Sequence, residues 1–348
     1  MAVTQRDIAE HLGVSVATVS RALKNSPRLK PETRGRVREA AAKLGYDSPN
    51  AYRKSGCEQD AGTLGVLVRF DGPEAAPGHT RMLAGISDVC EARDRMLSVH
   101  YARGDQLDWL TGENRPALLQ GDRVGGLILL NHFPDHIVQW LAGRWPCIVI
   151  HHYSPGLDVD IVEVDAIDGI GRLVRRLRDA GHRRIGFIGD ARRYEWTHAR
   201  HAAFVQALDT LEMDYEPACF TNAGAGQPEE VGDWMERRME EGVTAWMCAC
   251  DHLAGAIGKE LLRRGCSIPD QVSLTGFDGT TSLPDGRRIT SVETPFESLG
   301  AAATESLLRR LDYPSATRPH LLIPGRVVEG ETVAAPRTQS DHRHVSGR

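Results

Sequence analysis

The stretch "GVSVATVSRAL" (residues 13–23) combines side-chain types that suit contact with the edges of DNA bases. Val16 and Ala17 stand at the start of a short predicted helix, and small apolar groups there can pack on thymine methyl groups. Arg21 follows one turn later, and its guanidinium can form two hydrogen bonds with guanine O6 and N7. A helix that enters the major groove presents its first residues to the bases, so this stretch predicts a DNA-recognition helix.

Short polar side chains surround this set. Ser15, Thr18 and Ser20 carry donors that suit phosphate oxygens, which fix position on the duplex without reading its sequence. Four further side chains are predicted to follow the DNA backbone, namely Asn25, Arg28, Lys30 and Thr33. The competing interpretation is structural, with Val16 as an ordinary packing residue and Arg21 as a solvated surface charge.

Three short helices must position these side chains. Thr4 and Asp7 form a capping pair for the first helix, Ser15 begins the second, and Pro31 opens the third. A tight turn between the first two helices, with a third beside them, describes a helix-turn-helix domain. We therefore predict an all-α DNA-binding head over residues 1–46.

Charge is distributed unevenly along the 348 residues. The whole chain carries a net charge of −5, yet residues 1–60 hold 11 Lys and Arg against 7 Asp and Glu. A basic end on an acidic body is typical of a small nucleic-acid module joined to a domain with another task.

Composition argues against several classes of protein. The sequence has no apolar run of about 18 residues, as a membrane span would need, and its charged start lacks the apolar core of a signal peptide. A cytoplasmic protein is expected. The seven cysteines are scattered and odd in number, which favours reduced thiols over disulfides. Cys248 and Cys250 lack partners at zinc spacing, so neither a metal nor a cofactor is predicted.

Residues 63–330 alternate apolar runs with helical stretches. The apolar runs are 63–70, 124–130, 147–153, 183–189, 244–250 and 272–278, and the helices between them include 80–94, 166–180, 198–212, 229–241, 252–265 and 296–311. Runs that are apolar throughout and spaced by helices predict buried parallel strands. The length is large for one sheet, so we expect an α/β body of two lobes with a cleft between them.

The ordered motifs of the chain resemble those of the LacI/GalR family of bacterial transcriptional regulators. In the head, the resemblance runs from Val3 to Tyr46 and includes "GVSVATVSRAL" and "SPRLKPETRGRV". In the body, it is carried by "VDAIDGIGRLVRRLRDAGHRRIGFIG" (164–189), "SIPDQVSLTGFDGT" (267–280) and "ITSVETPFESLGAAA" (289–303). So many matches in one order make the resemblance specific.

The resemblance implies a two-lobed core like that of periplasmic sugar-binding proteins. Such a protein binds a palindromic double-stranded DNA operator as a homodimer, responds to a small effector in the cleft, and has no membrane partner. It also implies that Val16 and Ala17 determine which operator is chosen. The predicted boundaries are a head over 1–46, a hinge or linker over 47–62, one lobe of 63–163 plus 293–320, a second lobe of 164–292 plus 321–330, and a disordered tail over 331–348.

Sugars are bound by flat hydrogen-bonding groups and an aromatic platform. By resemblance, Arg200, Asp278 and Phe296 supply a guanidinium, a carboxylate and a ring. Tyr194 and Trp196 lie just ahead of Arg200 and are predicted to add stacking. The full predicted effector set is Asp71, His151, Arg200, Cys250, Asp251, Asp278 and Phe296. The competing interpretations are a loop-capping role for Asp278 and an ordinary histidine at the edge of the pocket for His151.

The hinge departs from the family pattern. The family's hinge folds into a short helix on DNA and inserts a leucine into the minor groove, whereas "SPNAYRKSGC" (48–57) contains no leucine. Tyr52 is the candidate apolar wedge, with Arg53 and Lys54 at phosphates. Gly56 disfavours a helix, so weaker bending of the operator is expected.

These features predict a ligand-responsive transcriptional regulator, with a repressor as the expected form, and not an enzyme. The sequence contains no Gly-x-Ser-x-Gly elbow, phosphate-binding loop or metal spacing. Two alternatives stay open: an architectural DNA binder with a non-functional pocket, and a sugar-processing enzyme. Incubation with candidate sugars and ligand-induced thermal stabilisation distinguish the three.

Overall fold

The computed structural model describes residues 4–23, 29, 31–44, 62–70, 76–103, 107, 115–121, 123–151, 156–189, 195–222 and 228–336. Several predicted site residues lie outside these ranges, and their roles stay predictions. They are Asn25, Arg28 and Lys30 after the recognition helix, Tyr52, Arg53 and Lys54 in the hinge, and Asp71 in the effector set.

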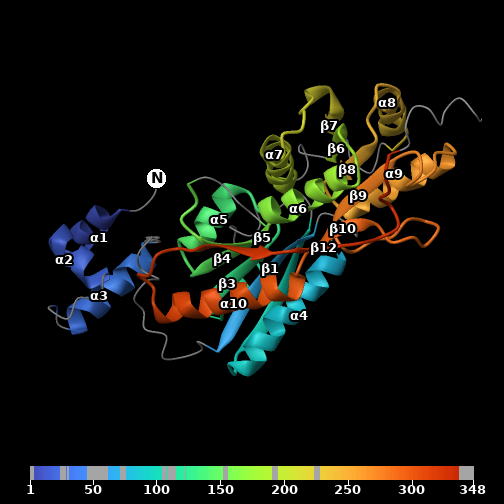
Figure 1. Cartoon of the computed structure of the whole chain (residues 1–348). Coiled ribbons are helices and arrows are strands. Elements are labelled where there is room, and N and C mark those ends of the chain that lie inside the picture. Colours follow the sequence, from blue (N-terminus) through green and yellow to red (C-terminus); the bar gives the residue numbers. More distant parts are fainter. Residues whose placement is uncertain are drawn as a thin grey trace, which may run out of the picture.

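Three short helices form the head (Figure 1), namely α1 (Gln5–Leu12), α2 (Val16–Leu23) and α3 (Pro31–Lys43). The predicted capping pair is confirmed, because Thr4 N donates to Asp7 Oδ2 at 2.6 Å and Asp7 N donates to Thr4 Oγ1 at 3.4 Å. Gly13 ends α1 with a left-handed φ of 64°, which glycine adopts freely. The buried core of the head consists of Ile8, Ala9, Val19, Ala22, Val37, Ala40 and Ala41.

The first sheet of the body has six parallel strands in the order β11-β5-β4-β3-β1-β2. Their bounds are β1 (Thr63–Phe70), β2 (Met96–Arg103), β3 (Gly126–Leu130), β4 (Cys147–Ile150), β5 (Asp160–Asp165) and β11 (His320–Pro324). Central runs such as "GLILL" in β3 are buried throughout, as expected for parallel strands covered on both faces. One face packs on α4 (Ala76–Ala92) and α10 (Phe296–Asp312), and the other on α5 (Asp135–Ala142) and a short 3-10 turn, η3 (Ala117–Leu119).

Helices α4 and α10 lie side by side (Figure 1) and approach each other at two glycines. A Cβ atom at Gly85 would lie 1.9 Å from Glu297 O, and one at Gly300 would lie 2.1 Å from Met82 O. Only glycine permits two helix backbones to come this close. The contact fixes the start of α10, and therefore Phe296, over the first sheet.

The second sheet also has six strands, in the order β12-β10-β9-β8-β6-β7, with β12 antiparallel and the rest parallel. Their bounds are β6 (Ile185–Gly189), β7 (Phe220–Asn222), β8 (Ala245–Cys248), β9 (Ser273–Asp278), β10 (Thr290–Glu293) and β12 (Arg326–Val328). One face packs on α6 (Ala166–Asp179) and α7 (Glu195–Thr210), and the other on α8 (Pro228–Glu240) and α9 (Asp251–Arg263), while η4 (Pro217–Cys219) leads into β7. None of the described helices is long and apolar enough to cross a membrane.

The chain passes between the two sheets three times, after β5, after β10 and between β11 and β12. The predicted lobe boundaries put the last passage after residue 320. However, β11 pairs with β5 from His320 to Pro324 and belongs to the first sheet. The passage therefore falls after Pro324, because strand pairing decides the lobe and a short edge strand gives no compositional signal of its sheet.

The described residues after β12, 329–336, are ordered. Positions 331–336 were predicted to begin a disordered tail, and this is wrong for the described part of the chain. Thr332 is fully buried, and its Oγ1 donates to Leu274 O at 2.6 Å and accepts from Thr290 N at 3.0 Å. We call residues 329–336 the C-terminal strap. The strap forms hydrogen bonds with β9 and β10 through single residues such as Thr332, and not as a paired strand. It therefore has no periodicity that a sequence pattern could reveal.

His182 anchors the end of the C-terminal strap. The imidazole is 1% exposed, with Nε2 at 2.9 Å from Ala334 O and Nδ1 at 2.8 Å from Thr244 Oγ1. Burial lowers the pKa of His182 to about 4, so the ring is neutral at pH 7. Because a carbonyl only accepts, Nε2 carries the proton and Nδ1 accepts from the threonine hydroxyl.

Candidate DNA-recognition surface and effector site

The exposed face of α2 carries the predicted base-reading residues. Val16 is 46% exposed although it is apolar, and Ala17 and Arg21 are exposed beside it. Val19 and Ala22 turn to the other side and are fully buried in the core of the head. The helix thus divides its apolar residues into a core set and a solvent-facing set. A packing role for Val16 does not explain this division.

Ser15 begins α2, as the sequence predicts. Its Oγ accepts from Thr18 N at 3.0 Å and lies 2.8 Å from Thr18 Oγ1. This contact satisfies one of the amides that a helix start leaves without an intrahelical partner. Ser20 and Thr33 are half-buried. The phosphate contacts assigned to these four residues stay predictions.

In the body, Arg200 of α7 and Asp278 at the end of β9 form an ion pair. Arg200 Nη2 donates to Asp278 Oδ1 at 3.0 Å, and Arg200 Nη1 donates to Ala249 O at 2.6 Å. Arg200 is 4% exposed, and its Cζ lies 3.8 Å from the ring centre of Phe277 and 4.4 Å from that of Trp196. The guanidinium is therefore fixed by hydrogen bonds and by two aromatic rings.

Asp278 is held in a conformation that few residues adopt. Its φ is 104°, in the region that favours glycine, and Gly279 follows with a φ of 70°. Thr294 restrains it, because Thr294 Oγ1 donates to Asp278 Oδ1 at 3.1 Å and Thr294 N donates to Asp278 O at 3.3 Å. Backbone strain of this kind costs about 1–3 kcal/mol and clusters at functional sites. The effector contact of Asp278 stays a prediction.

The first sheet contributes side chains at the carboxyl ends of its strands. His151 follows β4 with a φ of 58°, and its ring lies 6.5 Å from that of Phe296, edge to face. Asn131 follows β3 with a φ of 70°, and its Nδ2 lies 2.5 Å from His79 Nε2 and 3.1 Å from Arg69 O. Two neighbouring strands thus end in polar side chains on left-handed backbone.

Burial and charges of the second lobe both affect the pKa of His151. Burial is the main reason that the pKa of His151 falls to about 4; the charge of Arg200 lowers it further, and that of Asp278 opposes the change. The chain after β10 links the two sides, because Thr294 donates to Asp278 and Phe296, two residues later, lies beside His151. The His151 ring is neutral at pH 7 and offers one donor and one acceptor.

Asp251 is the first residue of α9. Its side chain is almost fully buried, with Oδ1 accepting from Ser291 Oγ at 2.6 Å and Oδ2 accepting from Thr280 N at 2.6 Å. Burial raises the pKa of Asp251 to about 7. Each oxygen already accepts a hydrogen bond from the protein, so the geometry favours a role in positioning the strand ends. The direct contact with an effector stays a prediction.

Cys250 stands at the start of α9, and its side chain makes no capping hydrogen bond. Burial raises the pKa of Cys250 to about 12, and the charge of Asp278 adds to the effect, so the sulfur is a protonated thiol at pH 7. Cys248, two residues earlier at the end of β8, is fully buried. Within the described residues, no three His, Cys, Asp or Glu side chains are grouped closely enough to hold a metal ion.

Three contributors to the site were not predicted: His79, Asn131 and Thr294. Asn131 carried a usable signal, because it is the first polar residue after a fully buried strand, as His151 is after β4. His79 had none, since its contact with Asn131 requires β1 and β3 to be neighbours. The sequence does not reveal that strand order.

Two family models match the chain. Residues 4–50 match the model described as bacterial regulatory proteins of the lacI family. Residues 174–333 match the model of a periplasmic binding protein-like domain. The first range contains α2, and the second contains Arg200 and Asp278.

Curated relatives match over most of their length. The transcriptional regulator GalS of Salmonella typhimurium is 28% identical over 88% of this chain and 89% of its own. GalR of Escherichia coli is 26% identical over 99% of both chains. Catabolite control protein A of Priestia megaterium is 24% identical over 94% of this chain and 98% of its own.

Solved structures share the fold. The transcriptional regulator CelR in its cellobiose complex matches with a TM-score of 0.69 and 23% identity, over 95% of this chain and 99% of that chain. The lac repressor dimer bound to operator and the anti-inducer ONPF matches with a TM-score of 0.66 and 21% identity, over 96% of this chain and 100% of that chain.

A three-helix DNA-binding head on a core of two parallel sheets defines a helix-turn-helix regulator with a periplasmic-binding-protein-like body. The chain belongs to the LacI/GalR family of bacterial transcriptional regulators. The relatives named above are regulators and not enzymes, which agrees with the function class that the sequence predicts.

Proposed function

We propose that this protein is a cytoplasmic repressor that binds a palindromic operator as a homodimer and is controlled by an uncharged carbohydrate. The effector is held between the two lobes, against Arg200, Asp278, His151 and Phe296. A shift in the balance between lobe arrangements changes the spacing of the two heads, and the operator half-sites demand a fixed spacing.

One arrangement carries the effector proposal: Thr294 holds Asp278 of the fixed guanidinium–carboxylate pair, and Phe296, two residues later, lies 6.5 Å from the neutral imidazole of His151. Arg200 and Asp278 offer flat, charged hydrogen-bonding edges, which suit vicinal hydroxyl groups. His151 adds a neutral donor and acceptor from across the site. Phe296 supplies the aromatic ring beside it.

The charge balance of the site favours a neutral ligand. The positive charge of Arg200 is compensated by Asp278 at 3.0 Å, and His151 carries no charge at pH 7. An anionic ligand such as a sugar acid would bring a further negative charge toward Asp278 without a spare cation among these residues. The cellobiose complex of the similar regulator CelR supports a sugar as the ligand class.

On the DNA side, we propose that Arg21 reads a guanine and that Val16 and Ala17 select the half-site. Their exposure on one face of α2 supports this. They lie within the first two turns, where a recognition helix meets base edges. Replacing Val16 and Ala17 with Tyr and Gln should move the preferred half-site and leave the head folded.

A thermal-shift screen with monosaccharides, oligosaccharides, sugar acids and nucleobases tests the effector class. We expect an uncharged sugar to raise the melting temperature and to be returned unchanged. Arg200→Ala and Asp278→Asn should each reduce its affinity by tenfold or more, because a lost contact to a charged group is worth about 1.5–3 kcal/mol. Operator binding without ligand should persist.

Arg172→Ala is the matched control, because Arg172 forms an exposed ion pair with Asp168 on α6 of the same lobe. It should leave effector affinity unchanged. Retained affinity in both site variants would place the effector elsewhere. No stabilisation by any compound would favour an architectural DNA binder, and chemical conversion of the sugar would favour an enzyme.

A further inference from the structure

The corners that lead into the strands of the first sheet carry an excess of arginine. We call this set of corners the amino edge. Its described arginines are Arg93, Arg95, Arg115, Arg123, Arg144, Arg309, Arg310 and Arg318, and its described acidic residues are Glu91, Asp94, Asp158, Asp160 and Asp312. Arg310 pairs with Asp160 and Arg318 pairs with Asp158, so two of these acids are neutralised. Positive charge remains in excess among the described residues of this edge.

Helix dipoles account for only part of this pattern. Cations are favourable at helix C-termini, and Arg93, Arg144 and Arg309 stand at or just beyond the ends of α4, α5 and α10. Arg123 follows no α-helix. Arg123 and Arg309 are both exposed, and neither makes an ion pair with any other described residue. Their guanidinium groups are available to an anionic partner.

The corner between α10 and β11 is built rigidly. Arg310 is 6% exposed and binds both oxygens of Asp160, at 2.7 and 3.2 Å. Its other donors bind the carbonyls of Pro314, Ala316 and Thr317, at 3.1, 2.5 and 3.0 Å. One buried guanidinium thus fixes the loop after α10 to the first residue of β5.

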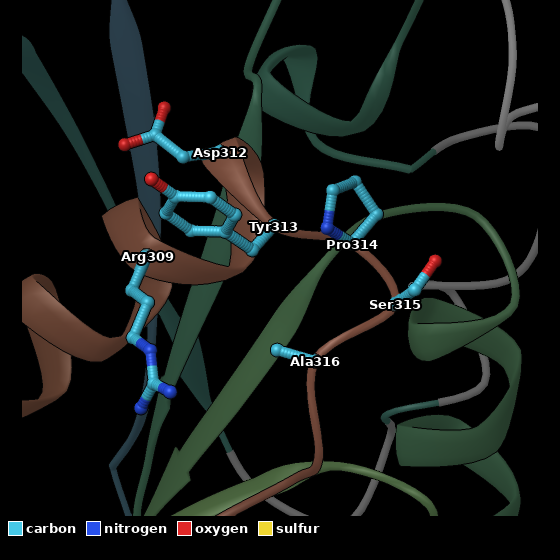
Figure 2. A pocket seen from close by; sticks show the side chains of 6 residues that line it. All are labelled: Arg309, Asp312, Tyr313, Pro314, Ser315 and Ala316. Atoms are coloured by element: carbon cyan, nitrogen blue, oxygen red, sulfur yellow. The ribbon is translucent and has the colours of Figure 1, made fainter.

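This loop surrounds a hollow of about 560 Å³ (Figure 2). It is lined by Arg309, Asp312, Tyr313, Pro314, Ser315 and Ala316. Arg309, Tyr313 and Ser315 present a guanidinium and two hydroxyl groups, which are side chains that commonly bind DNA phosphates. Tyr313 is 65% exposed. In Figure 2 the Arg309 guanidinium points away from the Asp312 carboxylate, with the tyrosine ring between them.

The amino edge is also where the chain from the head enters the body. Met96 N donates to Gly62 O at 2.6 Å, and Gly125 N donates to Thr63 O at 2.9 Å, so the start of β1 lies beside the starts of β2 and β3. Residues 45–61 join α3 to this point, and fully extended they span at most about 60 Å. DNA held by the head is therefore kept within reach of this edge.

We propose that the amino edge of the first lobe is a second DNA-contacting surface, which binds phosphates without reading sequence. The inference rests on DNA binding by the head and is independent of the effector. Arg123, Arg309, Tyr313 and Ser315 form the contact, and Asp312 opposes it. Such contacts strengthen all DNA binding and leave the consensus unchanged.

Fluorescence anisotropy on a mixed-sequence duplex, between about 50 and about 200 mM salt, tests this surface. The double variant Arg123→Ala/Arg309→Ala should bind more weakly, roughly tenfold for each phosphate lost at about 0.1 M salt, with a slope of log K against log salt shallower by about 0.9 per phosphate. Asp312→Asn should change affinity in the opposite direction. The conservative variant Arg123→Lys/Arg309→Lys should keep the wild-type slope.

The control is Arg175→Ala/Arg237→Ala, which removes the same charge from exposed positions on α6 and α8 of the second lobe. It should keep the wild-type slope, because these two arginines are not predicted to contact phosphates. Equal slopes in both double variants would overturn the proposal. So would weaker binding with an unchanged slope and a lowered melting temperature, which would assign the arginines to helix stability.

Discussion

At the scale of single residues, His182 and Asp251 affect stability in opposite directions as pH changes. The pKa of His182 is about 4 in the folded protein, below its ordinary value of 6.5. The unfolded chain therefore binds more protons, and the His182 contribution is lost as pH falls from about 6.5 toward 4. The pKa of Asp251 is about 7, above its ordinary value of 3.8, so its contribution is lost as pH rises from 3.8 through 7.

Melting temperatures between pH 4.5 and 7.5, roughly the window of these two groups, separate them. We expect His182→Gln to lose less stability on acidification than wild type, because the variant has no imidazole to charge. Asp251→Asn should lose less stability on raising the pH. Identical pH profiles for wild type and both variants would mean that neither group titrates differently in the folded and unfolded chains.

Arg21 acts at the same scale on DNA specificity. Its exposure on the first turns of α2 leads us to expect that Arg21→Ala abolishes operator preference and leaves weak non-specific binding. A bidentate contact to guanine is worth about 1–3 kcal/mol of discrimination. Selection of binding sites from random DNA measures this. Arg6→Ala, an exposed residue paired with Glu10 on α1, is the control. An unchanged consensus in Arg21→Ala would contradict the assignment.

At the scale of elements, the C-terminal strap should contribute measurably to stability. Thr332→Val keeps the size of the side chain but removes the hydroxyl, which leaves Leu274 O and Thr290 N buried with one partner fewer. An unsatisfied buried polar group costs about 1–3 kcal/mol. Chemical denaturation should detect a loss of that size. Thr210→Val, at an exposed helix position, should change stability by well under 1 kcal/mol. Equal losses in the two variants would mean that the hydrogen bonds of Thr332 contribute no more to stability than an exposed threonine does.

The elements also mark where sequence reasoning succeeds. Local signals sufficed for the head, since Thr4, Asp7 and Gly13 act within a few residues of one another. Continuous apolar runs identified the central strands. The edge strand β2 was missed because "MLSVHYAR" is half-exposed and mixes polar and apolar residues. The strands β10 to β12 were missed because each is three to five residues long.

For the site, the family pattern placed Arg200 and Asp278 together across 78 residues of sequence. Other features depend on strand order. Asn131 meets His79 only because β1 and β3 are neighbours, and Asp251 turns toward Ser291 only because β10 lies beside β9. Long-range pairing of this kind leaves no trace in the spacing of residue types.

At the scale of the whole molecule, β2 is the expected contact between two copies of the chain. It is an edge strand with one side unpaired in the described chain, and it exposes Met96 (72%), Val99 (38%) and Tyr101 (45%). Open strand edges with apolar side chains invite association. Tyr101→Glu should convert a dimer into a monomer and weaken operator binding.

Analytical ultracentrifugation measures the change. The control is Leu322→Glu on β11, which is 47% exposed and lies at the opposite edge of the same sheet. It should leave the dimer intact. A monomer formed by Leu322→Glu, with Tyr101→Glu still dimeric, would move the interface to the other edge.

The repeated passage of the chain between the sheets has a consequence for biosynthesis. The head needs only residues up to 44, but each sheet awaits a strand beyond residue 319, and the second is closed by the C-terminal strap. At a synthesis rate of about 5–20 residues per second, the head emerges roughly 15–60 s before the body can close. Ribosome-bound chains of increasing length, probed by proteolysis, should protect the head early and both lobes only near completion. A chain that stops short would then carry a folded head without a body to pair it or to control it, so synthesis of the last residues couples operator binding to effector control.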